Sequence, residues 1–238
     1  MRRPASMSCR SIELELMDDP ALETPRHVDA LKGLERINWW SASVATVWKP
    51  IKTLAERTRE PSLRVLDLAT GAGDVPIGLW QCASRSGVRV TVDGCDRSPR
   101  AVEYARARAR ERQADVGFFQ LDAVTDPLPA GYDIVTASLF FHHLSDEQVI
   151  SLLRRMAQAA KRLMVIADLE RGLPGLYLAY AATRVLSRSD VVRTDGPRSV
   201  RAAYALPEIQ ALARQAGLQG VSVVRRWPCR FLLTWKRA

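Results

Sequence analysis

Residues 65–74 read Val-Leu-Asp-Leu-Ala-Thr-Gly-Ala-Gly-Asp, and this stretch constrains the fold more than any other. The apolar run over residues 63–68 has the composition of a buried strand and carries Asp67 near its end. Small residues and glycines follow, and residues 74–84 then read as a helix. The order of strand, tight turn and helix predicts a helix N-terminus whose backbone N–H groups converge on a ligand.

Strands and helices alternate from this turn onward. Short apolar runs predict four further strands, at residues 88–95, 116–120, 132–137 and 163–167. Two segments between them read as helices, at residues 98–113 and 145–162. Ser98 is the expected N-cap of the first, and Ser145 matches a capping box with Gln148 at the second. Such alternation predicts a parallel sheet with helices on both faces, a doubly wound α/β fold.

The C-terminal part departs from the alternation. Residues 171–205 are predicted to be an insert, with an apolar helix-like part and then a polar segment around Asp195, Gly196 and Pro197. A helix and two strands follow, at residues 207–216, 219–226 and 229–235. The two strands meet at Trp227-Pro228 and read as a hairpin, which makes the last strand antiparallel.

The part before the first strand has two characters. Residues 1–30 are polar and proline-containing, and they are predicted to be a flexible or loosely attached lead-in. Residues 31–60 have apolar positions near helical spacing and predict one or two helices. These helices are candidates for a lid over the ligand, with Arg36, Asn38, Trp39 and Trp40. Ordinary packing explains the two tryptophans equally well. The remaining residues, 61–238, form the expected core domain.

Composition limits the classes of protein. A chain of 238 residues with 47% hydrophobic content is long enough for one well-buried α/β domain. No apolar run approaches the roughly 20 residues that span a bilayer, and no signal peptide is recognised. The cysteines at positions 9, 82, 95 and 229 are scattered, so we expect free thiols in a cytoplasmic protein.

The net charge of +9 bears on partners. Many basic residues fall on one predicted helix, at Arg100, Arg106, Arg108, Arg110 and Arg112. Such charge suits nucleic acid or peripheral contact with an anionic membrane. A solvated helix face in an arginine-rich chain is the favoured interpretation.

Two ligand classes compete for the glycine-rich turn. A dinucleotide needs G-x-G-x-x-G, but Pro76 stands where the third glycine should be. The carboxylates of Asp67 and Asp74 would also repel a pyrophosphate. They suit a ligand with an ammonium group, and S-adenosylmethionine has both an ammonium group and a cationic sulfonium. A turn without any ligand is the third alternative.

Residues 67–73, Asp-Leu-Ala-Thr-Gly-Ala-Gly, resemble motif I of the class I S-adenosylmethionine-dependent methyltransferases, Asp/Glu-x-Gly-x-Gly-x-Gly. Ala69 replaces the first glycine, and with Asp74 following, this variant is similar to the ubiquinone/menaquinone C-methyltransferase subgroup. The resemblance implies a Rossmann-like, mostly parallel seven-stranded sheet whose final strand is antiparallel. It is strong over residues 62–170 and holds only in outline elsewhere. The C-terminal tail loosely resembles bacterial methyltransferases of polyketide pathways.

Ligands of open α/β sheets bind at the carboxyl ends of the strands. Small residues after the first strand let the backbone approach the amino-acid part of the cofactor. Asp96, which ends the second strand, is assigned by the resemblance to the ribose hydroxyls, and Asp122 after the third to the adenine amino group. Capping or turn formation is the alternative role for these two aspartates. The predicted cofactor residues are Asp67, Ala69, Thr70, Gly71, Gly73, Asp74, Asp96, Arg97, Asp122, Ala123, Ser138, Leu139, Arg36 and Asn38.

The acceptor end follows the fourth strand, where residues 138–143 read Ser-Leu-Phe-Phe-His-His. Enzymes that methylate nucleic-acid bases resemble one another here, with Asn/Asp-Pro-Pro-Tyr/Phe, so this subclass is disfavoured. The paired aromatics suit an apolar or ring-bearing acceptor. His142 and His143 are candidates for the general base, because an imidazole with a pKa of about 6.5 accepts a proton near neutral pH. Helix capping or packing is the alternative role for each.

The sequence thus predicts a methyltransferase that acts on a small apolar or aromatic acceptor, phenolic or quinone-like, at oxygen or carbon. The insert over residues 171–205 is expected to line the acceptor pocket. No metal is expected, since no ligand cluster has a suitable spacing. An RNA or protein methyltransferase and a non-catalytic interaction protein that keeps the cofactor fold are the alternatives. The oligomeric state stays open.

Overall fold

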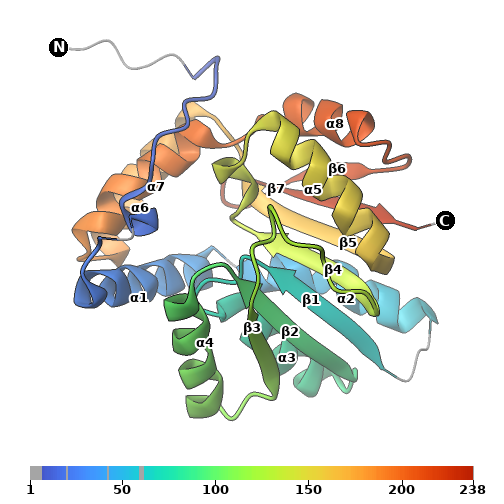
Figure 1. The fold of residues 1–238 in the computed structure, drawn as a ribbon. Coiled ribbons are helices and arrows are strands. Elements are labelled where there is room, and N and C mark those ends of the chain that lie inside the picture. Colours follow the sequence, from blue (N-terminus) through green and yellow to red (C-terminus); the bar gives the residue numbers. More distant parts are fainter. Residues whose placement is uncertain (1–6, 20, 42, 59–61, 238) are drawn as a thin grey trace.

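The computed structural model describes residues 7–19, 21–41, 43–58 and 62–237, without the side chains of Asp18 and Trp39. At its centre is a seven-stranded sheet in the order β3-β2-β1-β4-β5-β7-β6 (Figure 1). The strands are β1 (Leu63–Leu68), β2 (Val90–Asp96), β3 (Val116–Gln120), β4 (Tyr132–Ser138), β5 (Ala160–Leu169), β6 (Ser222–Arg226) and β7 (Arg230–Lys236). Strands β1 to β5 pair in parallel, whereas β7 is antiparallel to both β5 and β6. The predicted doubly wound sheet with an antiparallel C-terminal strand is confirmed.

Helices cover both faces of the sheet (Figure 1). They are α1 (Thr24–Trp40), α2 (Ser43–Thr58), α3 (Asp74–Ser86), α4 (Pro99–Glu111), α5 (Asp146–Ala159), α6 (Leu173–Leu186), α7 (Asp190–Ala202) and α8 (Leu206–Gln215), with short 3-10 turns η1 (Leu16–Asp18) and η2 (Phe141–His143). The Ser98 side chain caps α4, and Ser145 forms the capping box with Gln148 at α5. None of the helices in the described ranges is both long and apolar enough to cross a membrane.

The apolar run of β1 serves both layers of the core. Leu66 and Leu68 belong to the cluster that includes α5 and α8, whereas Leu63 and Val65 belong to the cluster on the other face, with α2 and α3. All four side chains are at most 1% exposed. A parallel strand that is buried on both faces needs such a continuous apolar run, and the run therefore identified this strand from sequence.

The N-terminal segment differs from the predicted lead-in. Helix α1 begins at Thr24, and residues 7–19, which we call the N-terminal strap, lie against the rest of the protein. The Arg10 guanidinium donates to Ala202 O at 2.8 Å and stacks 3.5 Å from the ring centre of Tyr204, while Ser11 N donates to Arg201 O. The prediction of a loosely attached lead-in is therefore wrong for these residues. Residues 1–6 and 20 lie outside the described part.

Two other expectations need correction. The predicted polar segment around Asp195 and Pro197 lies inside α7, and both residues are buried there. The arginine-rich helix α4 is not simply a solvated face. Arg108 is 5% exposed, and Arg106 donates to Phe118 O at 2.6 Å and 3.1 Å. Their guanidinium groups find carbonyl and carboxylate partners inside the protein, which offsets the cost of burying charge.

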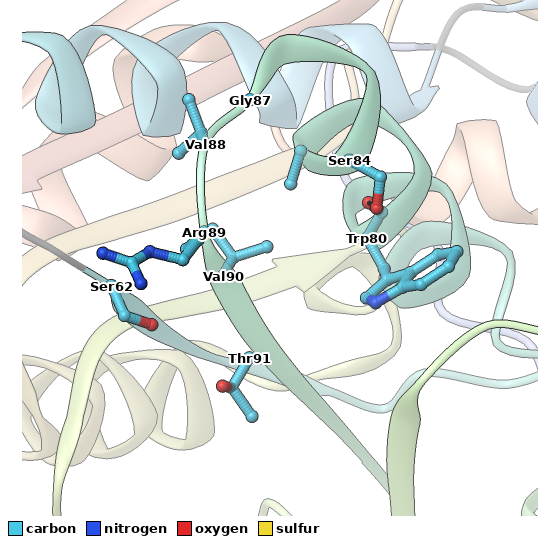
Figure 2. Close-up of a pocket in the computed structure, with 9 residues that line it drawn as sticks. Ser62, Trp80, Ser84, Gly87, Val88, Arg89, Val90 and Thr91 are labelled. Carbon is cyan, nitrogen blue, oxygen red and sulfur yellow. Dashed lines mark hydrogen bonds between the residues drawn. The ribbon is translucent and has the colours of Figure 1, made fainter.

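The two edges of the sheet differ in shape. A shallow depression lies where β1 and β2 begin, lined by residues such as Trp80, Ser84, Arg89 and Thr91 (Figure 2). The glycine-rich turn follows the carboxyl end of β1, at the opposite edge. The depression therefore does not belong to the edge at which ligands of such sheets bind.

Candidate functional site

The glycine-rich turn needs its glycines for different reasons. Gly71 and Gly73 both have positive φ angles, +53° and +77°. A Cβ atom at Gly73 would lie 2.9 Å from Phe118 Cζ, so a larger residue is excluded by space as well as conformation. A Cβ atom at Gly71 would meet nothing within 4 Å. Phe118 therefore leaves no room for a side chain at Gly73. The space beside Gly71 is open, so a ligand can approach the turn there.

Asp96 joins the end of β2 to this turn. Its Oδ2 accepts the backbone N–H of Gly71 at 2.8 Å, and its Oδ1 accepts that of Ser98 at 2.9 Å. A carboxylate offers about four acceptor positions, so one such side chain can hold backbone N–H groups and ligand hydroxyls together. Asp96 is placed both to shape the turn and to contact what binds there.

Three buried polar atoms lie without a hydrogen-bond partner in the described part of the chain: Asn38 Oδ1, Thr70 Oγ1 and Ser138 Oγ. Thr70 follows β1, Ser138 ends β4 and Asn38 comes from α1. The Thr70 hydroxyl lies near enough to Asp67 to lower its pKa, without a hydrogen bond of normal geometry. An unsatisfied buried polar atom costs about 1–3 kcal/mol. All three residues were predicted from sequence to bind the cofactor, and a polar ligand would relieve this cost.

Asp67 lies beneath the turn. Its side chain is 1% exposed, and its Oδ1 accepts the Thr136 hydroxyl at 2.6 Å. Burial raises the pKa of Asp67 to about 7, although the Thr136 hydroxyl opposes the shift. The sequence argument placed this carboxylate against a cationic ligand, whereas the structure buries it almost completely and pairs it with the Thr136 hydroxyl.

Asp74, the other acidic flank, is also engaged within the protein. One of its oxygens pairs with Arg108 at 2.9 Å, and the other accepts Asn38 Nδ2 at 2.9 Å. Arg108 further donates to Ala72 O and pairs with Glu35. Asp74 therefore ties α1, α3 and α4 together around the turn, and Asn38 takes part through this contact.

The remaining predicted cofactor residues lie in varied surroundings. Asp122 Oδ1 accepts Val124 N at 2.8 Å, the turn-forming role that was its alternative. Ala123 is buried, and Leu139, after β4, has a positive φ of 53°. Arg36 is exposed and donates to Leu186 O at 2.6 Å, because the end of α6 presents free carbonyl groups. The structure thus gives Arg36 a partner on α6.

The predicted base candidates meet a carboxylate that the sequence argument did not use. Asp168, in β5, is 1% exposed, and its Oδ1 lies 2.7 Å from Nδ1 of His142. Its Oδ2 accepts the backbone N–H groups of Phe140 and Phe141 at 3.0 Å and 2.6 Å. Asp168 therefore fixes both the backbone of η2 and the orientation of the His142 ring.

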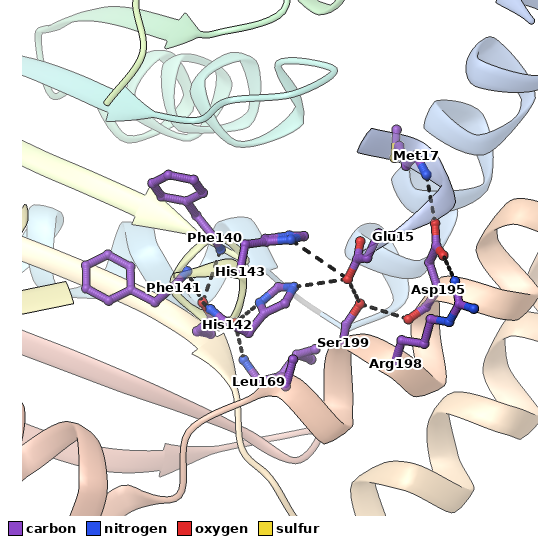
Figure 3. Close-up of polar contacts among 12 residues, drawn as sticks. Glu15, Met17, Phe140, Phe141, His142, His143, Leu169, Asp195, Arg198 and Ser199 are labelled. Carbon is purple, nitrogen blue, oxygen red and sulfur yellow. Dashed lines mark hydrogen bonds and ion pairs between the residues drawn. The ribbon is translucent and has the colours of Figure 1, made fainter. Parts of the chain in front are cut away.

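The strap brings a second carboxylate to the same place (Figure 3). Glu15 Oε1 lies 3.8 Å from His142 Nε2 and 3.9 Å from His143 Nδ1. Ser199 of α7 donates its hydroxyl to the same oxygen at 2.5 Å. The two histidine rings have centres 4.2 Å apart. Residues from the strap, η2 and α7 thus form one buried polar cluster.

Electrostatics distinguish the two histidines. Burial alone would lower the pKa of His142, but the charge and hydrogen bond of Asp168 raise it above its ordinary value. Burial and the neighbouring His142 lower the pKa of His143 to about 3. The pKa of Asp168 is lowered despite its burial, because His142 favours the carboxylate. Asp168 thus favours the protonated form of His142, whereas the surroundings of His143 favour its neutral form.

Sequence reasoning missed Asp168 and Glu15 as members of this cluster. Asp168 had a usable signal, since it falls at the carboxyl end of a strand as Asp96 does. Glu15 had none, because its segment was read as a loose lead-in. The lid prediction is untested at Trp39, whose side chain lies outside the described residues. Trp40 is 38% exposed and lies 6.1 Å from Trp227, measured between ring centres.

Comparison with known proteins matches residues 65–162 to the family described as "Methyltransferase domain". The demethylmenaquinone methyltransferase of Thermus thermophilus is 36% identical over 105 residues, which are 43% of this chain and 46% of that protein. The demethylmenaquinone methyltransferase of Deinococcus radiodurans is 36% identical over 93 residues, which are 39% of this chain and 37% of that protein. The chain spans about half, or less, of the length of these curated relatives.

Solved structures extend the likeness of fold over most of the chain. The magnesium protoporphyrin IX methyltransferase of Synechocystis, with SAH (S-adenosylhomocysteine) bound, has a TM-score of 0.59 and 20% identity, covering 92% of this chain and 90% of that one. Human N-acetylserotonin methyltransferase, in complex with SAM (S-adenosylmethionine), has a TM-score of 0.59 and 16% identity. The match covers 87% of this chain and 55% of that one.

Proposed function

We propose that this class I S-adenosylmethionine-dependent methyltransferase transfers a methyl group to a small apolar or aromatic molecule. A phenolic or quinone-like acceptor, methylated at oxygen or carbon, fits the proposal. The observation that carries the cofactor half is the coincidence of unpartnered buried polar atoms with predicted cofactor residues: Thr70 Oγ1 lies in the glycine-rich turn, Ser138 Oγ at the end of β4 and Asn38 Oδ1 on α1.

The cofactor residues divide by the strand that they follow. The turn after β1 takes the amino-acid part through its backbone, and Asp96 takes the ribose hydroxyls. Asp122 and Ala123 are the residues proposed to contact the adenine. When bound, S-adenosylmethionine supplies an electrophilic methyl group on its sulfonium. The chain contributes mainly position, since holding the reacting atoms in line removes much of the barrier.

The acceptor end comprises η2, the strap and α7. Phe140 lies beside the two histidines, and residues from the insert over 171–205 close the same edge (Figure 3). A small molecule that offers one polar group and an apolar body would suit this mixture of side chains. Relatives named for demethylmenaquinone favour such an acceptor. His142 and His143 stay the predicted candidates for the general base, and a cytoplasmic location stays a prediction.

Calorimetric titration with S-adenosylhomocysteine tests the cofactor half of the proposal. We expect one site per chain, and Asp96→Ala should weaken binding at least about a hundredfold, because two hydrogen bonds of a charged acceptor are worth roughly 1.5–3 kcal/mol each. Asp115→Ala is the matched control, since Asp115 is an exposed carboxylate before β3, at the opposite edge. Its affinity should equal that of the wild type.

A mass-spectrometric screen then tests the acceptor half. Extract metabolites incubated with the enzyme and S-adenosylmethionine should include a small apolar compound that gains one methyl group. No detectable binding of S-adenosylhomocysteine by the folded wild type would overturn the whole proposal. Methylation of RNA or protein, and of no small molecule, would overturn the acceptor class alone.

A further inference from the structure

The polar cluster at the acceptor end has the composition of a metal site. One donor atom each from His142, His143 and Glu15 lies within 4.8 Å of the other two. Two imidazoles and one carboxylate form a ligand set that suits divalent first-row transition ions. The three donors come from the strap and η2, so spacing along the sequence could not disclose them.

The distances are close to those that an ion requires. Nitrogen and oxygen ligands lie about 2.0–2.2 Å from Zn²⁺, which places neighbouring donors about 3.4 Å apart in a tetrahedral site. Glu15 Oε1 is 3.8 Å from one histidine donor and 3.9 Å from the other. Side-chain movements of roughly 0.5–1.5 Å would bring all three donors into range. Glu15 and His143 keep some exposure, 12% and 29%, so they have room for such movements.

The surroundings of His142 match those of a metal ligand. Its Nδ1 lies 2.7 Å from Asp168, and its Nε2 is the nitrogen that faces Glu15. Histidines that bind metals regularly use the second ring nitrogen in this way, because the carboxylate fixes the ring and makes the ligating nitrogen more basic. Asp168 is itself held by backbone N–H groups, so the ring has a rigid support.

We propose that Glu15, His142 and His143 bind a divalent transition ion, with Zn²⁺ as the test ion, and leave a coordination position for the acceptor. Three protein ligands and an open position are the arrangement of catalytic sites, whereas structural zinc sites use four ligands. The ligand donors are nitrogen and oxygen throughout, so the site is distinct from the chain's scattered thiols.

The consequence for chemistry rests on the proposed function. An acceptor hydroxyl bound to the ion has a lowered pKa and releases its proton to solvent. The electron pair left on the acceptor then forms the bond to the methyl carbon as the carbon–sulfur bond of the donor breaks, and that bond's electron pair stays on sulfur. The cluster would thus select hydroxyl-bearing acceptors.

Zinc titration of the full chain, prepared without a histidine tag, tests the site in the absence of cofactor and acceptor. We expect one Zn²⁺ per chain by competition with a chromogenic chelator. Asp168→Asn should weaken binding roughly 10–100-fold, and Glu15→Gln and His143→Ala should weaken it further. His27→Ala is the matched control, because His27 belongs to α1 and not to the cluster, and it should bind as the wild type does.

Cobalt substitution identifies the ligands. The Co²⁺ form should show ligand-field bands without thiolate-to-cobalt charge transfer. Binding of S-adenosylhomocysteine by each variant confirms that it is folded. Equal zinc binding by wild type and Glu15→Gln, no binding by the wild type, or a thiolate band would overturn the inference. If the wild type binds S-adenosylhomocysteine but no zinc, the proposed metal site is overturned and the proposed function stands. If it binds zinc but no S-adenosylhomocysteine, only the proposed function is overturned.

Discussion

At the scale of the residue, Gly73 and Gly71 form a natural pair of probes. Both have positive φ, so alanine at either position costs about 1–2 kcal/mol of backbone strain. Only at Gly73 would the new Cβ also press on Phe118, at 2.9 Å. Gly73→Ala should therefore lower the free energy of unfolding by roughly 1–3 kcal/mol more than Gly71→Ala, measured by urea denaturation. Equal losses would show that Phe118 moves aside without cost.

Asp67 offers a second test at this scale, through pH. Its pKa in the folded protein is raised to about 7, above the value of 3.8 expected when unfolded. The folded state thus prefers the protonated acid, and its contribution to stability is present at acid pH and is lost as pH rises through about 7. Asp67→Asn should lose this dependence. Urea unfolding should be measured at about pH 5 and about pH 8. The free energy of unfolding of the variant, relative to that of the wild type, should be higher at about pH 8 than at about pH 5. Parallel changes in both proteins would contradict the burial argument.

At the scale of the element, the strap depends on arginine contacts. Arg10 donates to Ala202 O, His142 O and Leu144 O, and further along the strap Asp195 accepts the N–H groups of Leu16 and Met17. Arg10→Ala should loosen the strap and speed amide hydrogen exchange at these two residues. The affinity for S-adenosylhomocysteine should stay the same, since the strap contacts the acceptor end.

A matched arginine on the surface controls for the loss of charge. Arg26 pairs with Asp190 where both side chains are largely exposed, and such pairs contribute about 0–1 kcal/mol. Arg26→Ala should leave amide exchange in the strap as it is in the wild type. If Arg10→Ala also leaves it unchanged, the strap is held by contacts other than those of Arg10.

At the scale of the whole molecule, part of the net charge of +9 sits on arginines that are buried in the fold, such as Arg108 and Arg171. Several arginine side chains donate hydrogen bonds to backbone carbonyl groups within the protein. These contacts join elements distant in sequence: Arg108 to Ala72, Arg155 to Ala123 and Val124, Arg171 to Ala203, and Arg237 to Ala160. These arginines have a role in the fold, so their presence alone does not argue for a nucleic-acid partner.

We therefore expect no specific affinity for RNA. Fluorescence anisotropy with single-stranded RNA at low salt should detect no binding beyond that of another protein of equal net charge. An RNA-binding surface would instead give an affinity that falls linearly, on logarithmic scales, as salt is added, because phosphate contacts release counterions. Such a slope would restore the alternative of an RNA methyltransferase.

The sequence predicted the sheet well because its signals are local. Continuous apolar runs marked the strands, and Ser98 and Ser145 marked where α4 and α5 begin. The cofactor was also predicted, although one of the arguments for it, the charge of two aspartates, was weak. Asp67 and Asp74 were expected to face a cationic ligand. In the structure Asp67 accepts a hydrogen bond from Thr136, and Asp74 forms an ion pair with Arg108. Pro76 and the resemblance of motif I were the stronger grounds.

The acceptor end could not be predicted to the same degree. The ligand set at His142 depends on Glu15 and Asp168, which reach it only through the fold. Residues 7–19 have no strong helical or strand pattern, and their position is decided by partners such as Tyr204 and Asp195. Contacts of this kind leave no periodic trace in a sequence.

The N-terminal strap has a consequence for how the two tasks of the molecule can change. The residues proposed to hold the donor lie mostly in one continuous stretch, from β1 to β4, whereas the acceptor end joins the strap to η2 and α7. Insertions and exchanges near the amino end can thus remodel the choice of acceptor while leaving the donor stretch untouched. A chain arranged in this way can acquire new substrates by altering segments that its sheet does not need.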